Sequence, residues 1–346
     1  MNISKQDLDF AARDGVISAP QADQLWRKLQ ERDTGSTKSK FDVANVAYYF
    51  GALIVMSAMG WLMNLGWERF GGTAISLLAI TYACLFILAG RTLWYQEKLT
   101  IPGGLLFTLA VWMTPLAIYG FEQATGIWPQ GAPNNFQSYH IWVKGSWIGM
   151  EIGTIIASLI ALRFVRFPFL TFPIAFSLWY MSMDLTPLLL GKSEFAWHDR
   201  LWVSLCFGLL TIVVTYFIDG RTREDYSFWG YLFGVMAFWG GLSLMESGSE
   251  WNKLMYCFVN IGLIILAVFL QRRVFVVFGA CGVFGYLGHL SYSVFKDSFL
   301  FPMALTFLGL AVIYLGVQYQ RHRQQFEEIV LGAIPESVRR LRPVER

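Results

Sequence analysis

The sequence predicts an all-α membrane protein: a polytopic transmembrane helical bundle of about ten spans, with a small cytosolic helical hairpin at its N-terminus. Two observations indicate this fold class. Apolar residues make up 55% of the 346 residues and charged residues only 15%, whereas soluble domains have about 25% charged residues. After residue 40, ten apolar runs follow one another. Each is roughly as long as a helix must be to cross about 30 Å of hydrocarbon.

The first forty residues are polar and contain two short helical patterns. Leu8 lies on the apolar face of the first, which ends near Gly15. Ser18 and Gln21 have the spacing of a capping box and begin the second helix. A hairpin this small buries little apolar surface, so we expect it to dock on the bundle or on a partner. The apolar positions of the two helices are Leu8, Ala11, Ala12, Ala22, Leu25, Trp26 and Leu29.

Lipid offers the backbone no hydrogen bonds, so each apolar run is expected to be a helix. With the N-terminus cytoplasmic, 21 of the 27 Lys and Arg residues fall on the inner side of a ten-span topology. This bias follows the positive-inside rule and predicts that both termini are cytoplasmic. The predicted spans are 43–65, 71–90, 101–121, 147–164, 167–190, 201–218, 227–245, 253–271, 273–294 and 299–319.

These runs divide the chain into three parts. Residues 1–40 form the hairpin and a linker, residues 41–320 the bundle, and residues 321–346 a cytosolic amphipathic tail. The tail is basic, and its arginines suit anionic lipid headgroups. The predicted partners are therefore the lipid bilayer, anionic lipid at the tail, and a cytosolic protein or a second copy of the chain.

Ionisable side chains within the apolar runs are candidates for function, because a charge at the middle of a membrane helix costs about 2.5–3.5 kcal/mol. Glu151, Asp184 and His289 lie at similar predicted depth toward the outer side. They are expected either to share one cavity as a proton relay or cation site, or to pair structurally. Asn260 lies near the middle of its run, where an amide either bonds across a helix interface or binds a solute. An outer acidic rim consists of Glu122, Glu246 and Asp297.

Two further features leave alternatives open. Gly279, Gly282, Gly285 and Gly288 recur every third residue. This ladder favours close helix packing, and the alternative is a solute path lined by backbone. The outer loop 122–146 is longer than a simple connection needs. It is either a lid or a segment whose aromatic residues lie among the headgroups.

Several classes of chemistry lack their motifs. The four cysteines lie in apolar runs without a CxxC pair, and no two histidines have zinc-ligand spacing. No Walker, Rossmann or GxSxG pattern stands at a strand–helix junction. The N-terminal hairpin has no third helix and no strongly basic second helix, so it is not expected to bind nucleic acid. The sequence therefore predicts no cofactor, no metal and no catalytic residues.

One resemblance to a known family comes from the segment DLDFAARDGVISAPQADQLW, followed by a linker and about ten apolar runs. This arrangement resembles bacterial predicted membrane proteins of the family catalogued as domain of unknown function 2157. The resemblance implies a bacterial inner-membrane location. It implies no established activity and no site residues.

Three hypotheses follow. The first is a permease for a small solute or ion, with an outer acidic vestibule and with Glu151, Asp184 and His289 as coupling groups. The second is a non-transporting scaffold or sensor that engages a cytosolic partner through residues 1–40. The third and least favoured is a membrane-embedded enzyme acting at the outer face.

Overall fold

The structure is a computed structural model that describes residues 43–69, 71–127, 147–190, 197–222, 224–245 and 248–295, with isolated positions on either side. It describes the backbone alone at 62–69, 184–190, 197, 291, 294 and 295. All regular structure in the described residues is helical, as predicted. The chain divides into two compact units, Met1–Leu53 and Ile54–Arg346. The isolated positions are 8, 12, 16–18, 20–26, 28, 303, 306, 307, 309, 310, 313, 314, 317, 318 and 321.

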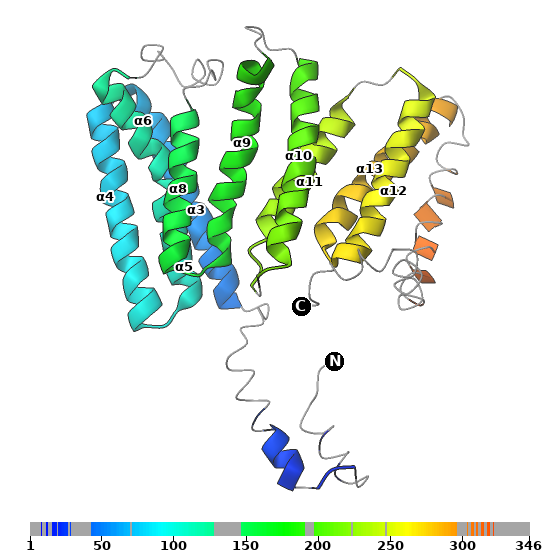
Figure 1. The fold of residues 1–346 in the computed structure, drawn as a ribbon, viewed down its shortest axis with the longest axis horizontal. Helices are drawn as coiled ribbons and strands as arrows, with labels where there is room; N and C mark the ends of the chain where they lie inside the picture. Colours follow the sequence, from blue (N-terminus) through cyan, green and yellow to red (C-terminus); the bar gives the residue numbers. More distant parts are fainter. Residues whose placement is uncertain are drawn as a thin grey trace. The chain divides into compact units, whose positions relative to one another are not determined.

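The described helices coincide with the first nine predicted runs, and most of the tenth lies outside the described residues (Figure 1). In chain order they are α3 (Val43–Arg69), α4 (Gly72–Arg91), the π-turn η1 (Thr92–Gln96), α5 (Thr100–Trp112), α6 (Thr114–Thr125), α8 (Ile148–Phe164), the 3-10 turn η2 (Pro168–Leu170), α9 (Thr171–Leu190), α10 (Trp197–Asp219), α11 (Phe228–Leu244), α12 (Glu250–Leu270) and α13 (Arg273–Phe295).

One predicted run differs in the structure. The run 101–121 consists of two helices, α5 and α6, which meet at Met113. Pro115 lies in the first turn of α6. Proline has no backbone N–H and clashes with the preceding turn, so the hydrogen-bond ladder is interrupted there. A hydropathy pattern does not register this break, because both helices are apolar.

Six described helices are long and apolar enough to cross a membrane, and α11 is apolar but shorter. Large apolar side chains are exposed along them, including Leu77 and Leu88 of α4 and Leu210 and Phe217 of α10. Such surfaces suit a lipid bilayer. The six segments are Val43–Trp61, Gly72–Gln96, Thr100–Thr125, His198–Asp219, Glu250–Leu270 and Arg273–Leu290.

Within the unit Ile54–Arg346, glycines set the close approach of neighbouring helices. α4 packs on α6, and α10 on α11. A β-carbon added at Gly72 would lie 2.5 Å from the carbonyl oxygen of Gly120. Serines bond across the same pairs: the Ser76 hydroxyl donates to the Ala117 carbonyl, and the Ser204 hydroxyl to the Ala237 carbonyl. Small residues of this kind are the usual contact surface between membrane helices.

An aromatic cluster on α9 joins helices on both of its sides. The ring of Phe172 lies 5.4 Å from Trp112 of α5 and 4.5 Å from Trp229 of α11. Phe176 contacts Trp112 and Phe233 in edge-to-face geometry. Tilted and edge-to-face ring pairs add stabilisation beyond the area they bury. α9 is therefore a central packing element of the bundle.

The N-terminal unit contains the predicted second helix. The backbone N–H of Ser18 donates to Oε1 of Gln21 at 2.9 Å, which is one half of the expected capping box. Leu8 and Ala22 are buried, as the apolar pattern predicts. Leu25 is 48% exposed, so it does not belong to the buried face. Ala11, Leu29, the linker and nearly all of the 321–346 tail lie outside the described residues.

Candidate functional site

Helix α8 turns a polar face into the bundle. Its buried residues include Glu151, Thr154 and Ser158, which are 5%, 1% and 0% exposed. Their spacing of three and four residues places them along one side of the helix. The outward side is apolar and consists of Ile152, Ile156, Leu159, Ile160 and Phe164. We refer to Glu151, Thr154 and Ser158 as the α8 polar face.

The hydroxyls of the α8 polar face differ in their partners. Thr154 donates to the carbonyl of Met150 at 2.7 Å, one turn earlier. The hydroxyl of Ser158 is buried and has no hydrogen-bond partner among the residues that the structure describes. A bound water or ion is one way in which a buried polar group in this state is satisfied. α8 packs against α5, α6 and α9, so the polar face lies between helices.

A second predicted acid lies beside this face. Glu122, near the end of α6, reaches over the first turn of α8, where a β-carbon added at Gly149 would lie 2.7 Å from Glu122 Oε1. Glu151 follows two residues later on α8. The α6–α8 junction therefore gathers one predicted rim residue and one predicted coupling residue at the same end of the bundle. We call this the Glu151 end.

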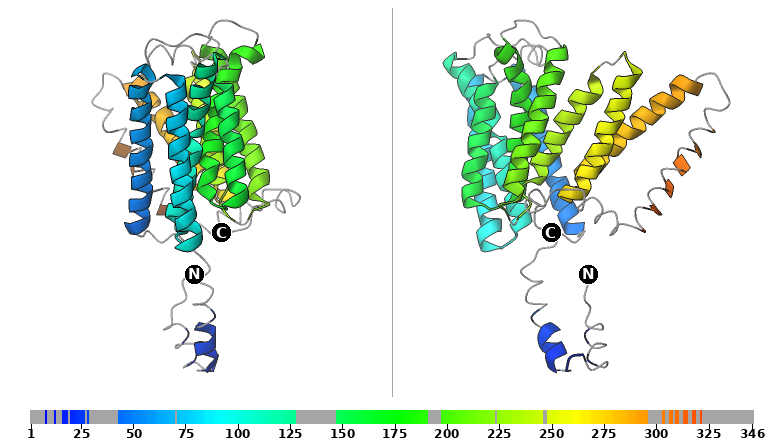
Figure 2. Two further views of the ribbon diagram at one scale, coloured as in Figure 1. Left: turned by 90° about the vertical axis from the view of Figure 1, so that its left-hand side faces the viewer. Right: turned by 45° about the vertical axis from the view of Figure 1, so that its right-hand side comes forward.

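His289 has other neighbours. Its Nε2 lies 3.0 Å from Nζ of Lys253 and 3.8 Å from Oε1 of Glu250, both on α12. Lys253 also pairs with Glu250 at 2.6 Å. Helices α9, α10 and α11 stand between α8 and α13 in Figure 1 and in the right-hand view of Figure 2. The structure thus does not bring Glu151 and His289 together.

Three predicted site residues have side chains that the structure leaves undescribed. Asp184 lies in α9, the neighbour of α8, and only its backbone is described. Glu246 and Asp297 lie outside the described residues. A site shared by Glu151 and Asp184 therefore stays a prediction.

Asn260 is fully buried between α12 and α13. Its Nδ2 donates to the carbonyl of Tyr256 at 2.8 Å, and its Oδ1 faces Gly282, where a β-carbon would overlap the carboxamide. At Gly279 a β-carbon would lie 2.7 Å from the Asn260 carbonyl oxygen. The contacts at Gly279 and Gly282 support the packing interpretation of the first half of the glycine ladder. The Nδ2 bond of Asn260 stays within α12, and its Oδ1 has no hydrogen-bond partner among the described residues. The structure thus shows no amide bond across the helix interface, and the role of Asn260 stays a prediction. Gly285 and Gly288 face open space.

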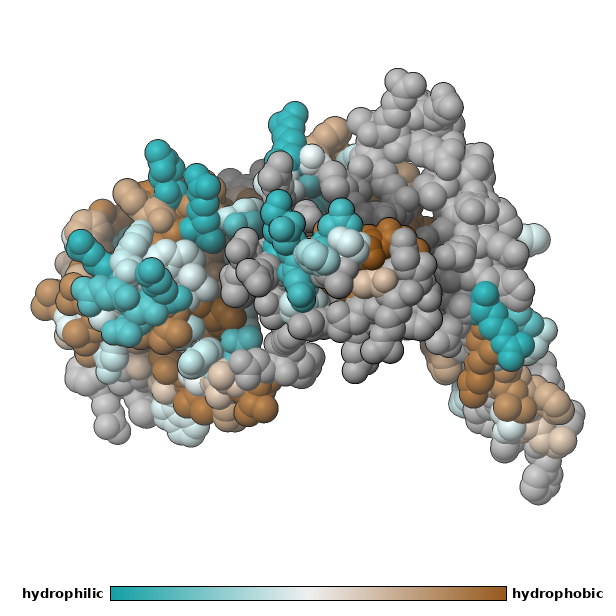
Figure 3. Space-filling view, turned by 90° about the horizontal axis from the view of Figure 1, so that it is seen from below, coloured by the Kyte–Doolittle hydropathy of each residue, from teal (hydrophilic) through white to brown (hydrophobic). Residues whose placement is uncertain are grey.

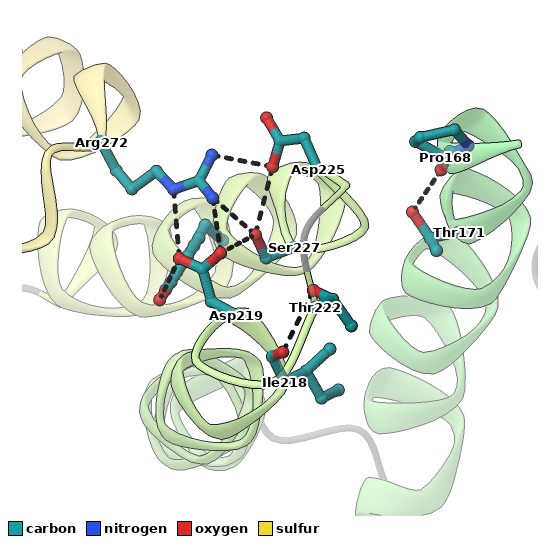
Figure 4. A network of polar contacts seen from close by, with 9 residues as sticks. Pro168, Thr171, Ile218, Asp219, Thr222, Asp225, Ser227 and Arg272 are labelled. Atoms are coloured by element: carbon teal, nitrogen blue, oxygen red, sulfur yellow. Dashed lines mark hydrogen bonds and ion pairs between the residues drawn. The ribbon is translucent and has the colours of Figure 1, made fainter. Parts of the chain in front are cut away.

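A charged network that the sequence analysis missed joins the turn after α12 to the turn between α10 and α11 (Figure 4). Arg272 Nη2 lies 2.6 Å from Oδ1 of Asp219, and its Nε donates to Oδ2 at 3.3 Å. Its Nη1 lies 2.8 Å from Asp225, and Nη2 also donates to the Ser227 hydroxyl. Ser227 donates to Asp219, as does the Tyr231 hydroxyl. We call these five residues the Arg272 network.

Local structure positions Arg272. Gln271 has φ +54°, a left-handed conformation that ends α12 and turns the chain. The side chain of Asp219 is 0% exposed, that of Arg272 is 15% exposed and that of Asp225 is 46% exposed. The guanidinium lies 5.6 Å from the centre of the Tyr231 ring. The Arg272 network therefore contains one fully buried carboxylate, that of Asp219, and one partly exposed carboxylate, that of Asp225.

The electrostatics keep Arg272 charged. Burial acts to lower the pKa of its guanidinium, but the hydrogen bonds and negative charges of Asp219 and Asp225 outweigh it and raise the pKa above its usual value. Removing one partner of a buried pair leaves the other charge uncompensated, at a cost of about 3–5 kcal/mol. The only sequence signal was an aspartate closing an apolar run on the predicted basic side. This signal does not identify Arg272 as the partner of Asp219, because the two residues lie in turns that are far apart in the chain.

The Arg272 network lies at the end of the bundle opposite the Glu151 end. Basic residues are exposed at the ends of other helices on this side, including Arg91, Arg163 and Arg166. Hydrophilic residues gather in the left-hand part of the view of this side in Figure 3, with hydrophobic residues around them. Among the described residues, no group of three His, Cys, Asp or Glu side chains is placed to hold a metal ion.

Comparison with protein-family models, with curated proteins and with solved structures finds no match to this chain. The resemblance to domain of unknown function 2157 stays a prediction.

Proposed function

We propose that the chain is a permease of the bacterial inner membrane for a small solute or ion, coupled through a carboxyl at the Glu151 end. The observation that carries this proposal is the α8 polar face. A helix whose buried residues are Glu, Thr and Ser together with one Met, and whose outward residues are Ile, Leu and Phe, is suited to line a polar path through lipid.

The chemistry of Glu151 supports coupling to protons or cations. A carboxyl held between membrane helices can bind a proton or a cation that reaches it. Glu151 would then take up a proton or cation at one side of the membrane and release it at the other. Glu122 lies on the adjoining turn and adds a second carboxyl at the entrance. The hydroxyl of Ser158, which has no hydrogen-bond partner among the described residues, supplies a donor and acceptor two turns deeper.

The same proposal assigns ten spans with both termini cytoplasmic. Six described helical segments of sufficient length, together with the apolar helix α11, support a membrane protein with several spans, and the count of ten is part of the proposal. The exposed arginines at the Arg272 end support its assignment to the cytoplasmic side, as the positive-inside rule requires.

The test is proton flux in liposomes that contain the purified full-length chain, read by an entrapped pH-sensitive dye after an imposed pH step. The wild type is expected to conduct, and Glu151→Gln to slow the flux at least about tenfold, the effect of losing a proton-transfer group. Glu97→Gln, an exposed acid at the opposite end, is the matched control and is expected to conduct normally. Flux no greater than in protein-free liposomes, or unchanged flux in Glu151→Gln, would refute the proposal.

The second candidate is a scaffold or sensor that acts through residues 1–40. The formed capping bond between Ser18 and Gln21 favours it, because the headpiece contains a defined helix with an exposed Leu25. On this hypothesis, removal of residues 1–40 abolishes co-purification of a cytosolic protein. Glu151→Gln leaves that co-purification unchanged.

A further inference from the structure

Two helical hairpins meet at the Arg272 end: α10 with α11, and α12 with α13. In the Arg272 network all the acceptors belong to the first hairpin: Asp219, Asp225 and Ser227. The cationic donor, Arg272, belongs to the turn of the second hairpin. The network thus joins the two hairpins through contacts between opposite charges. We call the surface where the two hairpins meet the seam.

Apolar contacts between the hairpins begin near the same end. Toward the opposite end the hydroxyls of Ser243 in α11 and Tyr256 in α12 lie 2.8 Å apart and also join the two hairpins. Tyr231 of α11 packs edge-to-face on Phe275 of α13, with ring centres 5.5 Å apart, and Trp239 packs on Phe278. Phe275 and Phe278 belong to the first two turns of α13. Farther along α13, β-carbons at Gly285 and Gly288 would meet no atom within 4 Å. In Figures 1 and 2, α13 leans away from α11 with distance from the Arg272 end.

We infer that the Arg272 network is a latch that holds the two hairpins together at the Arg272 end, and that releasing it lets the hairpins part there. This inference rests on the proposed permease function, since a path through the membrane must close at one end while it opens at the other. In the structure the two hairpins are joined at the Arg272 end.

The geometry suits a contact that can form and break rather than a permanent one. Asp219 is fully buried, so the closed state has one strong anchor. Asp225 is about half exposed and offers Arg272 an intermediate partner on the way out. The seam crosses between two hairpins that are each closed by their own helix–helix contacts, so separation leaves both hairpins intact. Two discrete arrangements of packed elements are what a gate requires.

The test measures the distance across the seam by double electron–electron resonance in the full-length chain in lipid nanodiscs. Spin labels replace the exposed Arg221 and Arg273, one on each hairpin turn, after the four free cysteines are changed to serine. In the otherwise unchanged protein we expect one short distance. In Arg272→Gln we expect a second, longer population, since the substitution removes the ionic contacts that favour the joined state. Asp225→Asn is expected to shift fewer molecules in the same direction.

Two controls keep the result interpretable. Arg91→Gln removes an exposed arginine on the same side and is expected to leave the distance unchanged. A label pair at Arg221 and Arg166 reports the distance from the first hairpin to the α8–α9 turn and is expected to stay constant in Arg272→Gln.

A single unchanged distance in both Arg272→Gln and Asp225→Asn would overturn the latch, and so would equal broadening of both label pairs. If the wild type conducts no protons but Arg272→Gln shows the longer population, the permease proposal is refuted. The latch is then retained as a conformational contact that serves another function. If Arg272→Gln does not fold, Asp225→Asn alone decides.

Discussion

The carboxamide of Asn260 on α12 lies directly against Gly282 on α13. The absence of a side chain at Gly282 lets the two helices approach closely enough to bury the amide completely. The same pair shows how the glycine ladder divides: its first half is a contact surface, and its second half faces open space.

Gly282→Ala is expected to destabilise the α12–α13 pair. The added methyl group overlaps the Asn260 carboxamide, and overpacking of this kind costs about 1–3 kcal/mol. Reversible unfolding in mild detergent measures the loss. Gly285→Ala is the matched control: it meets no neighbouring atom, so its stability is expected to stay the same or to rise slightly. Equal loss in both variants would contradict the contact.

Adjacent glycines of α11 give a second matched pair. A β-carbon at Gly241 would lie 2.7 Å from the carbonyl oxygen of Leu201 in α10, whereas Gly240 has open space. Gly241→Ala is therefore expected to lower the unfolding midpoint by an amount equivalent to about 1–3 kcal/mol. Gly240→Ala is expected to leave it unchanged. If Gly240→Ala were the more damaging variant, the packing of α10 on α11 would be wrong.

Ser158→Ala separates stability from transport. The wild-type hydroxyl is buried without a partner in the described part of the chain, so its removal is expected to cost nothing or to gain up to about 1 kcal/mol. Proton flux is nevertheless expected to fall, because the path loses a polar group. Thermal unfolding and liposome flux on the same preparation check both effects. A marked loss of stability would show that the hydroxyl has a partner in the folded protein.

The contribution of Arg272 to the free energy of unfolding is expected to stay constant as the pH rises into the alkaline range. Its folded pKa is raised above the unfolded value, so the contribution is fully present below the unfolded pKa. It would be lost only as pH rises through the still higher folded value, beyond the range of ordinary experiments. The difference in unfolding free energy between wild type and Arg272→Gln, about 3–5 kcal/mol, should therefore be the same at pH 8 and at about pH 10.5. A difference that shrinks over this interval would contradict the buried pair.

Local patterns in the sequence were sufficient to predict where the helices lie in the chain. Apolar length predicts α10 and α12 closely, and the Ser18–Gln21 spacing predicts a bond that forms. Hydropathy overlooked the break before Pro115, because it averages over residues that are apolar on both sides.

Tertiary pairings were harder to predict. Glu151 was identified from its type and depth, and it is buried. Its expected partner His289 instead lies beside Lys253 on another helix pair, because helix neighbours are set by packing and not by depth. Arg272 was counted only among the basic residues that indicate the topology, and Asp219 was not singled out, since no local pattern links two turns across the bundle.

The most direct test of the polar path is the water accessibility of α8 in the membrane. Single cysteines at Thr154, Ser158, Ile156 and Ile160, in a full-length background without the four native cysteines, are treated with a charged, membrane-impermeant thiol reagent in membrane vesicles of both orientations. We predict that the cysteines at 154 and 158, on the buried polar face, are modified and that those at 156 and 160, on the exposed apolar face, are not. Modification confined to 156 and 160, or absent at all four positions, would contradict a polar path along α8.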